Sequence, residues 1–208
     1  TSKGVAAVTI RNYHLHLRSI SKHLDITMPF CSLTKRHLER MVVSMRAAGL
    51  AHNTVATYLR VINTFLNWAN REGLTSVSIP NIKEKDTVKE TYTDEALERM
   101  RDYCDTSRDL AIIDILASTG MRVGELVKLN RSDIDFQNRE CVVTGKGNKQ
   151  RKVYFDARTK IHLQNYLDER TDDNDALFVT LLAPYNRLQI SGVEIRLRQL
   201  GRESNIRK

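Results

Sequence analysis

The chain has 208 residues, of which 41% are apolar and 28% are charged, as in ordinary soluble globular proteins, and it is long enough for two modest domains. No stretch approaches the roughly 20 consecutive apolar residues of a membrane helix. The N-terminus lacks the basic and apolar regions of a signal peptide. The three cysteines are scattered and form no CxxC pair, which argues against a disulfide framework and a zinc site. We therefore expect a cytoplasmic protein that does not enter membranes.

The formal net charge of +8 favours a polyanionic partner, nucleic acid before membrane. Residues 1–88 contain 12 Lys or Arg and 5 Asp or Glu, a net of +7. Residues 89–208 contain the remaining 21 and 20, a net of +1, with a local basic stretch free of acids at 141–152. The first part of the chain thus carries most of the net charge.

The segment 5–73 is predicted to be helical throughout, because apolar residues recur at helical spacing in three stretches. Thr34 is a good N-cap for the second helix. The third helix is expected to begin near Asn53 and Thr54 and to end at Gly73, a normal residue after a helix C-terminus. The pattern predicts a small all-α bundle.

The second half changes character along its length. Residues 74–92 are polar and aperiodic, which indicates a linker, and Thr93 is expected to cap a new helix. From Asp135 onwards the apolar pattern has period two, and the runs 141–144 and 152–155 flank a glycine-containing turn typical of a β-hairpin. Helices are expected again over 156–167 and 191–200. This half is therefore predicted to be α+β with a small antiparallel sheet.

Two cations lie at positions suited to chemistry. Arg122 lies at a glycine-containing break between two helices, where its planar guanidinium can point out of a rigid frame towards a phosphate. Lys146 lies at the tip of the hairpin between two glycines, which allow close backbone approach to a groove. Taken singly, a loop arginine is usually a surface ion-pair residue and a tip lysine is usually solvated.

In this order and spacing, the two motifs resemble the tyrosine-recombinase (phage integrase) family, which includes lambda-type and Xer recombinases. Residues 118–136, STGMRVGELVKLNRSDIDF, are similar to the family's first catalytic-arginine motif. Residues 142–155, VVTGKGNKQRKVYF, are similar to its hairpin with the catalytic lysine. The helix around Asn53 and Thr54 is similar to a helix of the family's core-binding domain. The sequence of these motifs is most similar to that of integrases of phages and conjugative transposons.

The resemblance implies a two-domain fold. An all-α core-binding helical bundle (SAM-like) is expected over 1–80 and a linker over 81–92. The N-terminal portion of an α+β catalytic domain of the DNA breaking-rejoining type is expected over 93–208. The implied activity is integration or excision of a mobile element in the bacterial cytoplasm, in association with the nucleoid. The implied partner is double-stranded DNA carrying a recombination site, with the protein forming a dimer to tetramer on it.

In this family a tyrosine hydroxyl attacks a DNA phosphodiester and forms a 3′-phosphotyrosyl link, leaving a free 5′-hydroxyl, without metal or cofactor. The resemblance assigns to Arg122 the stabilisation of negative charge on the nonbridging oxygens. It assigns to Lys146 the protonation of the leaving 5′-oxygen. Glu125 matches a recurrent family carboxylate, and we expect it to orient Arg122 or its helix.

The family's later motifs, a His-x-x-Arg pair, a further His or Trp and the nucleophilic tyrosine, are not found after the hairpin. The sequence is therefore interpreted as a fragment that ends before its nucleophile and is inactive alone. The run His37–Arg40 fits the letters of the pair, but it precedes Arg122 and is explained by a helix of the first domain. Tyr166 is expected at the outer edge of a helix and Tyr154 in sheet packing, so neither is a candidate nucleophile.

A noncatalytic DNA-binding regulator with a recombinase-like fold is the main alternative, and the charge distribution supports it equally well. Only a recombinase, however, has a reason to keep Arg122 and Lys146 at this spacing. A nucleotide-binding loop at 145–148 is disfavoured because a strand follows it, not a helix. A helical adaptor is disfavoured by the positive first half. Candidate DNA contacts, mostly to phosphates, are Arg11, Lys35, Arg36, Thr54, Arg60, Lys149 and Arg151.

Overall fold

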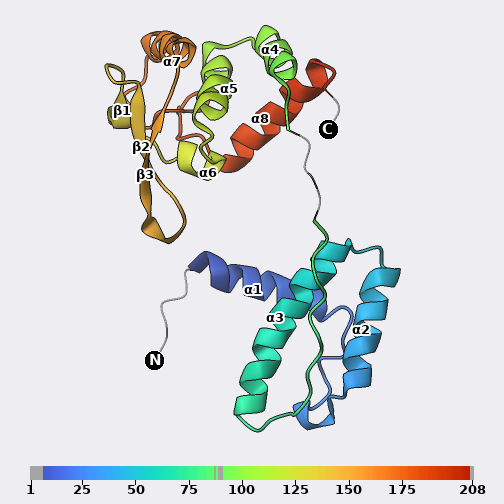
Figure 1. Cartoon of the computed structure of the whole chain (residues 1–208). Coiled ribbons are helices and arrows are strands. Elements are labelled where there is room, and N and C mark those ends of the chain that lie inside the picture. The colour runs from blue at the N-terminus through green and yellow to red at the C-terminus, as the bar shows by residue number, and fades with distance from the viewer. Residues whose placement is uncertain (1–6, 87, 89–90, 207–208) are drawn as a thin grey trace. The chain divides into compact units, whose positions relative to one another are not determined.

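The computed structural model describes residues 7–86, 88 and 91–206. The chain forms two compact units, residues 1–89 and 90–208 (Figure 1). Each unit has its own hydrophobic core. Among the described residues, no helix is both long and apolar enough to cross a membrane.

The first unit is a helical bundle, as predicted. Its second helix begins with a capping box at Thr34: the Thr34 hydroxyl accepts from the His37 amide at 3.4 Å, and His37 Nδ1 accepts from the Thr34 amide at 3.2 Å. His37 therefore has a structural role at a helix N-terminus. The elements of this unit are α1 (Ala7–Ile20), the 3-10 turn η1 (Phe30–Ser32), α2 (Lys35–Ala47) and α3 (His52–Arg71).

The core of the bundle lies where α2 and α3 meet. Leu38 and Met41 of α2 and Leu59 and Leu66 of α3 are almost completely buried. These residues recur every three or four positions, so one face of each helix is apolar and packs on the other. In α1 only Ile20 is buried to a similar degree.

Residues 74–86 have no regular secondary structure, but they pack along α3, and we call them the strap. Asn63 Nδ2 donates to the carbonyl of Ile79 at 2.7 Å, and Ile79 is buried. Asn53 donates to the Lys85 carbonyl at 3.0 Å and accepts from the Lys85 amide at 2.9 Å. Polar side chains of α3 thus satisfy the strap's backbone groups.

The strap occupies part of the segment that the sequence indicated as a linker. The predicted linker over 81–92 includes residues that are hydrogen bonded to α3, and the compact units divide between residues 89 and 90. The strap's polar, aperiodic composition is compatible both with a free linker and with a segment packed on α3, because the side chains that bind it lie far away in the sequence.

The second unit combines helices with a small antiparallel sheet, as predicted. Its central helix is α5, which contacts α4, α7, α8 and β3 and lies between the sheet and α8 (Figure 1). The elements are α4 (Asp94–Asp102), α5 (Ser107–Thr119), α6 (Val123–Leu126), the 3-10 turn η2 (Arg131–Asp133), β1 (Ile134–Asp135), β2 (Glu140–Thr144), the 3-10 turn η3 (Lys146–Asn148), β3 (Gln150–Tyr154), α7 (Ala157–Glu169) and α8 (Ile190–Glu203).

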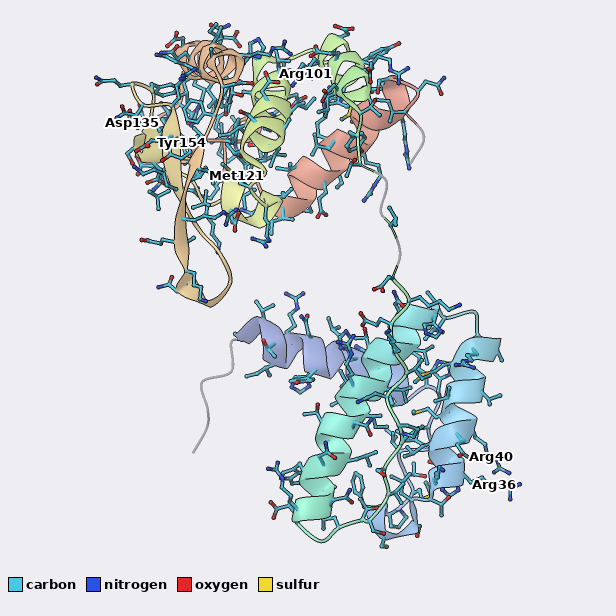
Figure 2. All side chains as sticks on the ribbon, in the orientation of Figure 1. Arg36, Arg40, Arg101, Met121, Asp135 and Tyr154 are labelled. Carbon is cyan, nitrogen blue, oxygen red and sulfur yellow. The ribbon has the colours of Figure 1, made fainter. Side chains whose placement is uncertain are left out.

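The sheet has the strand order β1-β2-β3, and β2 and β3 form the predicted hairpin with Val143 opposite Arg151. Side chains alternate between the two faces of a strand. Val143 and Val153 therefore enter the core, and Arg151 lies on the same face as Val153. Tyr154 is paired with Glu140 in the sheet, as the expectation of sheet packing implies, but it lies on the other face from Val153 and is 62% exposed. Figure 2 labels its position in the sheet.

Tyr166 was misplaced by the sequence analysis, because it is buried in the core and not at the outer edge of α7. Its hydroxyl accepts from the Val179 amide at 3.1 Å, and its ring stacks on Phe178 with centroids 5.3 Å apart. The chain after α7 folds back on this helix, which a helical period cannot show. Burial raises the pKa of the Tyr166 hydroxyl, which makes it less suited to act as a nucleophile.

Candidate active site

The backbone around Arg122 forms a rigid turn between α5 and α6. Gly120 ends α5 in the left-handed conformation with φ 61°, which glycine adopts without strain. Met121 is buried and fixes the turn to the core (Figure 2). Arg122 then takes the N-cap position of α6, and its side chain is 75% exposed. The guanidinium thus extends into solvent from a fixed backbone.

The buried carboxylate of Glu125 joins this turn to the hairpin. Its Oε2 accepts from the Arg122 amide at 2.9 Å, and its Oε1 accepts from Arg122 Nη1 at 3.1 Å. Arg151 donates one terminal nitrogen to each oxygen, both at 2.8 Å. The side chain of Glu125 is only 4% exposed, so its charge is neutralised by these two arginines and not by water.

The hydrogen bonds of Arg151, followed by those of Arg122, lower the pKa of Glu125 to about 2, although burial acts in the opposite direction. The carboxylate is therefore ionised at every physiological pH. It is a fixed negative charge and not a proton donor.

The hairpin closes tightly against Glu125. The Gly145 amide donates to the Lys149 carbonyl at 2.8 Å, and a Cβ atom at Gly145 would lie 3.1 Å from Glu125 Oε1. A side chain at residue 145 would thus press on the carboxylate. Lys146 follows in η3, at the tip that projects away from the helices of this unit (Figure 1); its side chain lies outside the described part of the structure.

Arg151 was predicted as a DNA contact, and sequence reasoning missed its pairing with Glu125. The signal was present in the strand alternation, because Arg151 is two residues from buried Val153 and opposite buried Val143. Arg151 itself is 41% exposed, and it is the buried Glu125, 4% exposed, whose charge requires a partner on this face of the strand.

Two of the other candidate DNA contacts are paired within the protein. Lys35 lies 3.8 Å from Glu39, one turn along α2, and both side chains are exposed. Arg60 of α3 forms an ion pair with Glu84 of the strap. Exposed pairs of this kind contribute little to stability, so both cations can exchange their partner for a phosphate.

Among the described residues, the side chains of Arg11, Arg36 and Lys149 have no hydrogen-bonded or ion-paired partner, and all three are exposed. Figure 2 shows Arg36 extending from α2 into solvent beside Arg40. Thr54 lies in the first turn of α3 and is half-buried. Within the second unit, the structure brings Arg122 and the hairpin of Lys149 together around Glu125.

A buried ion cluster between α5 and α8 has no counterpart in the sequence analysis. Asp109 is 1% exposed and accepts from Arg108 at 3.0 and 2.7 Å and from Arg196 at 2.5 Å. These contacts hold α8 on the central helix. No group of three or more His, Cys, Asp or Glu that could hold a metal ion occurs in the described parts of the chain.

The lowered pKa of Glu125 makes a pH-dependent contribution to stability. The folded value of about 2 is below the ordinary 4.5, so the contribution is complete above about pH 4.5 and is lost as the pH falls towards 2. The shift corresponds to roughly 3 kcal/mol, because one pKa unit is about 1.4 kcal/mol. We expect the neutral variant Glu125→Gln to be less stable than the parent at pH 6. Urea unfolding should show this difference shrinking between pH 5 and pH 3, and a constant difference would contradict the assignment.

The family model described as "Phage integrase family" matches residues 89–208, and that described as "Phage integrase, N-terminal SAM-like domain" matches residues 1–73. The chain is 27% identical to tyrosine recombinase XerC of Vibrio cholerae over 99% of its own length and 70% of that protein.

Solved structures are similar as well. The XerA recombinase aligns over 98% of this chain and 73% of its own, with 25% identity and a TM-score of 0.53. A lambda integrase tetramer bound to a Holliday junction aligns over 100% of this chain and 61% of its own, with a TM-score of 0.83 and 15% identity. The second similarity concerns the fold alone, and it agrees with the predicted helical bundle followed by an α+β domain.

Proposed function

Because the chain belongs to the phage integrase family, we propose that it is part of a site-specific recombinase of a mobile element, which integrates or excises DNA through a 3′-phosphotyrosine intermediate. The observation that carries the proposal is the position of Arg122. Its exposed guanidinium extends from a fixed turn, and the carboxylate that holds this turn also holds the hairpin of Lys146.

In the proposed reaction, a tyrosine oxygen forms a bond to phosphorus and loses its proton, while the bond from phosphorus to the 5′-oxygen breaks. Arg122 donates hydrogen bonds to the nonbridging oxygens, where negative charge grows in the transition state. Lys146 gives a proton to the departing 5′-oxygen. Rejoining is the reverse, so the phosphodiester energy is conserved and no nucleotide cofactor is required. The nucleophile is not assigned to any residue of this chain.

Double-stranded DNA is the proposed partner. Arg11, Arg36 and Lys149 are exposed cations that can contact phosphates without breaking an internal ion pair. Lambda integrase, whose fold this chain shares, is known as a dimer on a core site and as a tetramer on a Holliday junction. We propose that this protein likewise assembles as a dimer to tetramer on its recombination site, in the bacterial cytoplasm at the nucleoid.

The first test is DNA binding by this chain to a duplex of arbitrary sequence a few helical turns long. Neutralising about six phosphates should make the affinity fall by on the order of 10³ between about 50 and 200 mM salt. The double variant Arg36→Ala, Lys149→Ala should reduce the slope of log affinity against log salt by about 2. Absent binding at low salt, or binding that does not change with salt, would overturn the proposal.

The second test separates a recombinase from a noncatalytic DNA-binding regulator. A duplex selected for binding from a random-sequence pool, carrying a nick near its centre, is incubated with the complete gene product that contains this chain. The nick allows the released fragment to diffuse away, so a covalent protein–DNA adduct accumulates. Adduct formation supports the recombinase, and binding without any adduct supports the regulator.

A further inference from the structure

We propose that Arg151 is a positioning residue for the hairpin tip that bears Lys146, and not a DNA contact. This inference rests on the proposed function and adds to it a residue, Arg151, that acts indirectly by positioning Lys146. Both terminal nitrogens of Arg151 donate to Glu125 at 2.8 Å and form a bidentate arginine–carboxylate pair. The two N–H groups that face Glu125 are therefore engaged within the protein, while the rest of the side chain is 41% exposed.

The bond between Arg151 and Glu125 joins α6 to the hairpin at the point where the tip, residues 145–149, begins. Arg151 is paired with Val143 in the sheet, and Lys146 lies in the tip between these two positions. On the opposite arm, Gly145 lies close to the same carboxylate, since a Cβ atom added there would lie 3.1 Å from Glu125 Oε1. Both arms of the hairpin thus meet Glu125 at the point where the tip begins.

Without this anchor, little else would hold the tip in one place. The tip residues 147–149 are exposed, and the Gly145–Lys149 backbone hydrogen bond lies within the hairpin itself. A two-stranded ribbon that projects from a protein can bend at its base. The Glu125–Arg151 pair fixes the ribbon where the tip begins, so the tip keeps one position relative to Arg122.

The geometry also separates the effect of Arg151 from that of Arg122. Arg122 has its own two hydrogen bonds to Glu125, from its amide and from Nη1, and neither involves Arg151. Loss of Arg151 should leave the hydrogen bonds between Arg122 and Glu125 in place and release only the hairpin. A defect in an Arg151 variant should therefore concern proton donation to the leaving group.

The experiment compares Arg151→Met and Arg151→Lys in the complete gene product, with Lys152→Met as the matched control. Lys152 is a cation on the same strand, but it lies on the opposite face and pairs with Glu140 at 2.6 Å. The rate of adduct formation is measured at saturating nicked duplex. One duplex has an ordinary phosphodiester, and the other has sulfur in place of the 5′-bridging oxygen. A thiolate leaves without being protonated, so the second duplex does not need a general acid.

With the ordinary duplex, Arg151→Met should be slower by about 10²-fold, the usual contribution of a general acid. With the sulfur-containing duplex, the defect should largely disappear. Arg151→Lys should recover only part of the rate, because an ammonium group cannot bind both carboxylate oxygens in the same way. Lys152→Met should behave as the parent with both duplexes. Equal defects on both duplexes, or none on either, would overturn the proposal.

Two further measurements test whether Arg151 contacts DNA and whether it anchors the tip. If Arg151 were a phosphate contact, Arg151→Met would weaken DNA binding and reduce its salt slope by about 1, as Lys149→Met is expected to do. Under our proposal its binding is unchanged. Amide hydrogen exchange in this chain without DNA tests the anchor itself. In Arg151→Met, the Gly145 amide, which is hydrogen bonded to the Lys149 carbonyl, should exchange about tenfold faster while the amides of α5 do not change; unchanged exchange at Gly145 would contradict the anchor. If the parent forms no adduct but the exchange result holds, the proposed function fails and the anchor stands.

Discussion

An Arg122→Ala variant of the complete gene product should form the covalent DNA adduct about 10²–10³-fold more slowly than the parent, as after removal of a positioned donor to a developing negative charge. The guanidinium is 75% exposed, and the turn is also held by the backbone hydrogen bond from Arg122 to Glu125. The fold should therefore remain, although the free energy of unfolding should fall by about 1–3 kcal/mol, because the buried Glu125 carboxylate loses one charged donor.

The matched variant for this test is Arg36→Ala, which removes an exposed cation from the other unit. Both variants should lose about one unit of the salt slope for DNA binding. Only Arg122→Ala should lose the rate of adduct formation at saturating DNA. Arg122→Lys should be almost as slow as Arg122→Ala, because lysine lacks the planar pair of donors. A normal rate in Arg122→Ala would remove the basis of the proposed mechanism.

The largest expected effect on stability belongs to the ion cluster between α5 and α8. Asp109→Ala removes a carboxylate that is 1% exposed and takes the main charged partner from the buried Arg108 and from the 18% exposed Arg196. Breaking a buried ion pair in this way typically costs about 3–5 kcal/mol. The control is Asp105→Ala, whose side chain is 84% exposed and lies 3.6 Å from Arg196. It should change stability by less than about 1 kcal/mol.

Because the chain has two compact units, the first unit can serve as an internal reference when the unfolding of the second unit is measured. The chain has a single tryptophan, Trp68, which lies in α3 of the first unit. In urea, Asp109→Ala should lower the midpoint detected by circular dichroism for the second unit, while the Trp68 fluorescence transition stays in place. Because two units can unfold separately, one two-state fit to the whole chain is not appropriate. Equal shifts in both signals, or an equal effect of Asp105→Ala, would contradict the assignment.

The features that the sequence predicted are those governed by neighbouring residues. Thr34 and Asp156 cap helices because their side chains reach an amide three residues ahead. The hairpin at 141–155 follows from the period-two alternation on both sides of a glycine-containing turn. Arg122 and Lys146 were proposed as site residues for a related reason, since each lies in a short motif whose spacing can be read directly.

The features that were missed depend on contacts between distant residues. Tyr166 is buried because residues 176–179 return to α7. The strap was predicted as a linker because its partners, Asn53 and Asn63, lie on the polar side of α3. The periodicity of α3 predicts packing through its apolar face only and does not show that these polar side chains bind another segment. Asp109 is one of many charged residues in the sequence, and only the packing of α8 on α5 buries it.

The strap has a consequence for how tightly the whole protein can hold DNA. Lys85 is fixed to α3 by two hydrogen bonds, and Thr93 caps α4, so residues 86–92 alone form the covalent connection outside these anchors. Even fully extended, this connection cannot exceed about 30 Å. If both units bind one duplex as proposed, the second unit stays within this radius once the first has bound. Its local concentration is then of millimolar order, and two weak interactions combine into one strong one. Substitution of Asn53 and Asn63 would free the strap and lengthen the connection, so avidity would fall although no DNA-contacting side chain had changed.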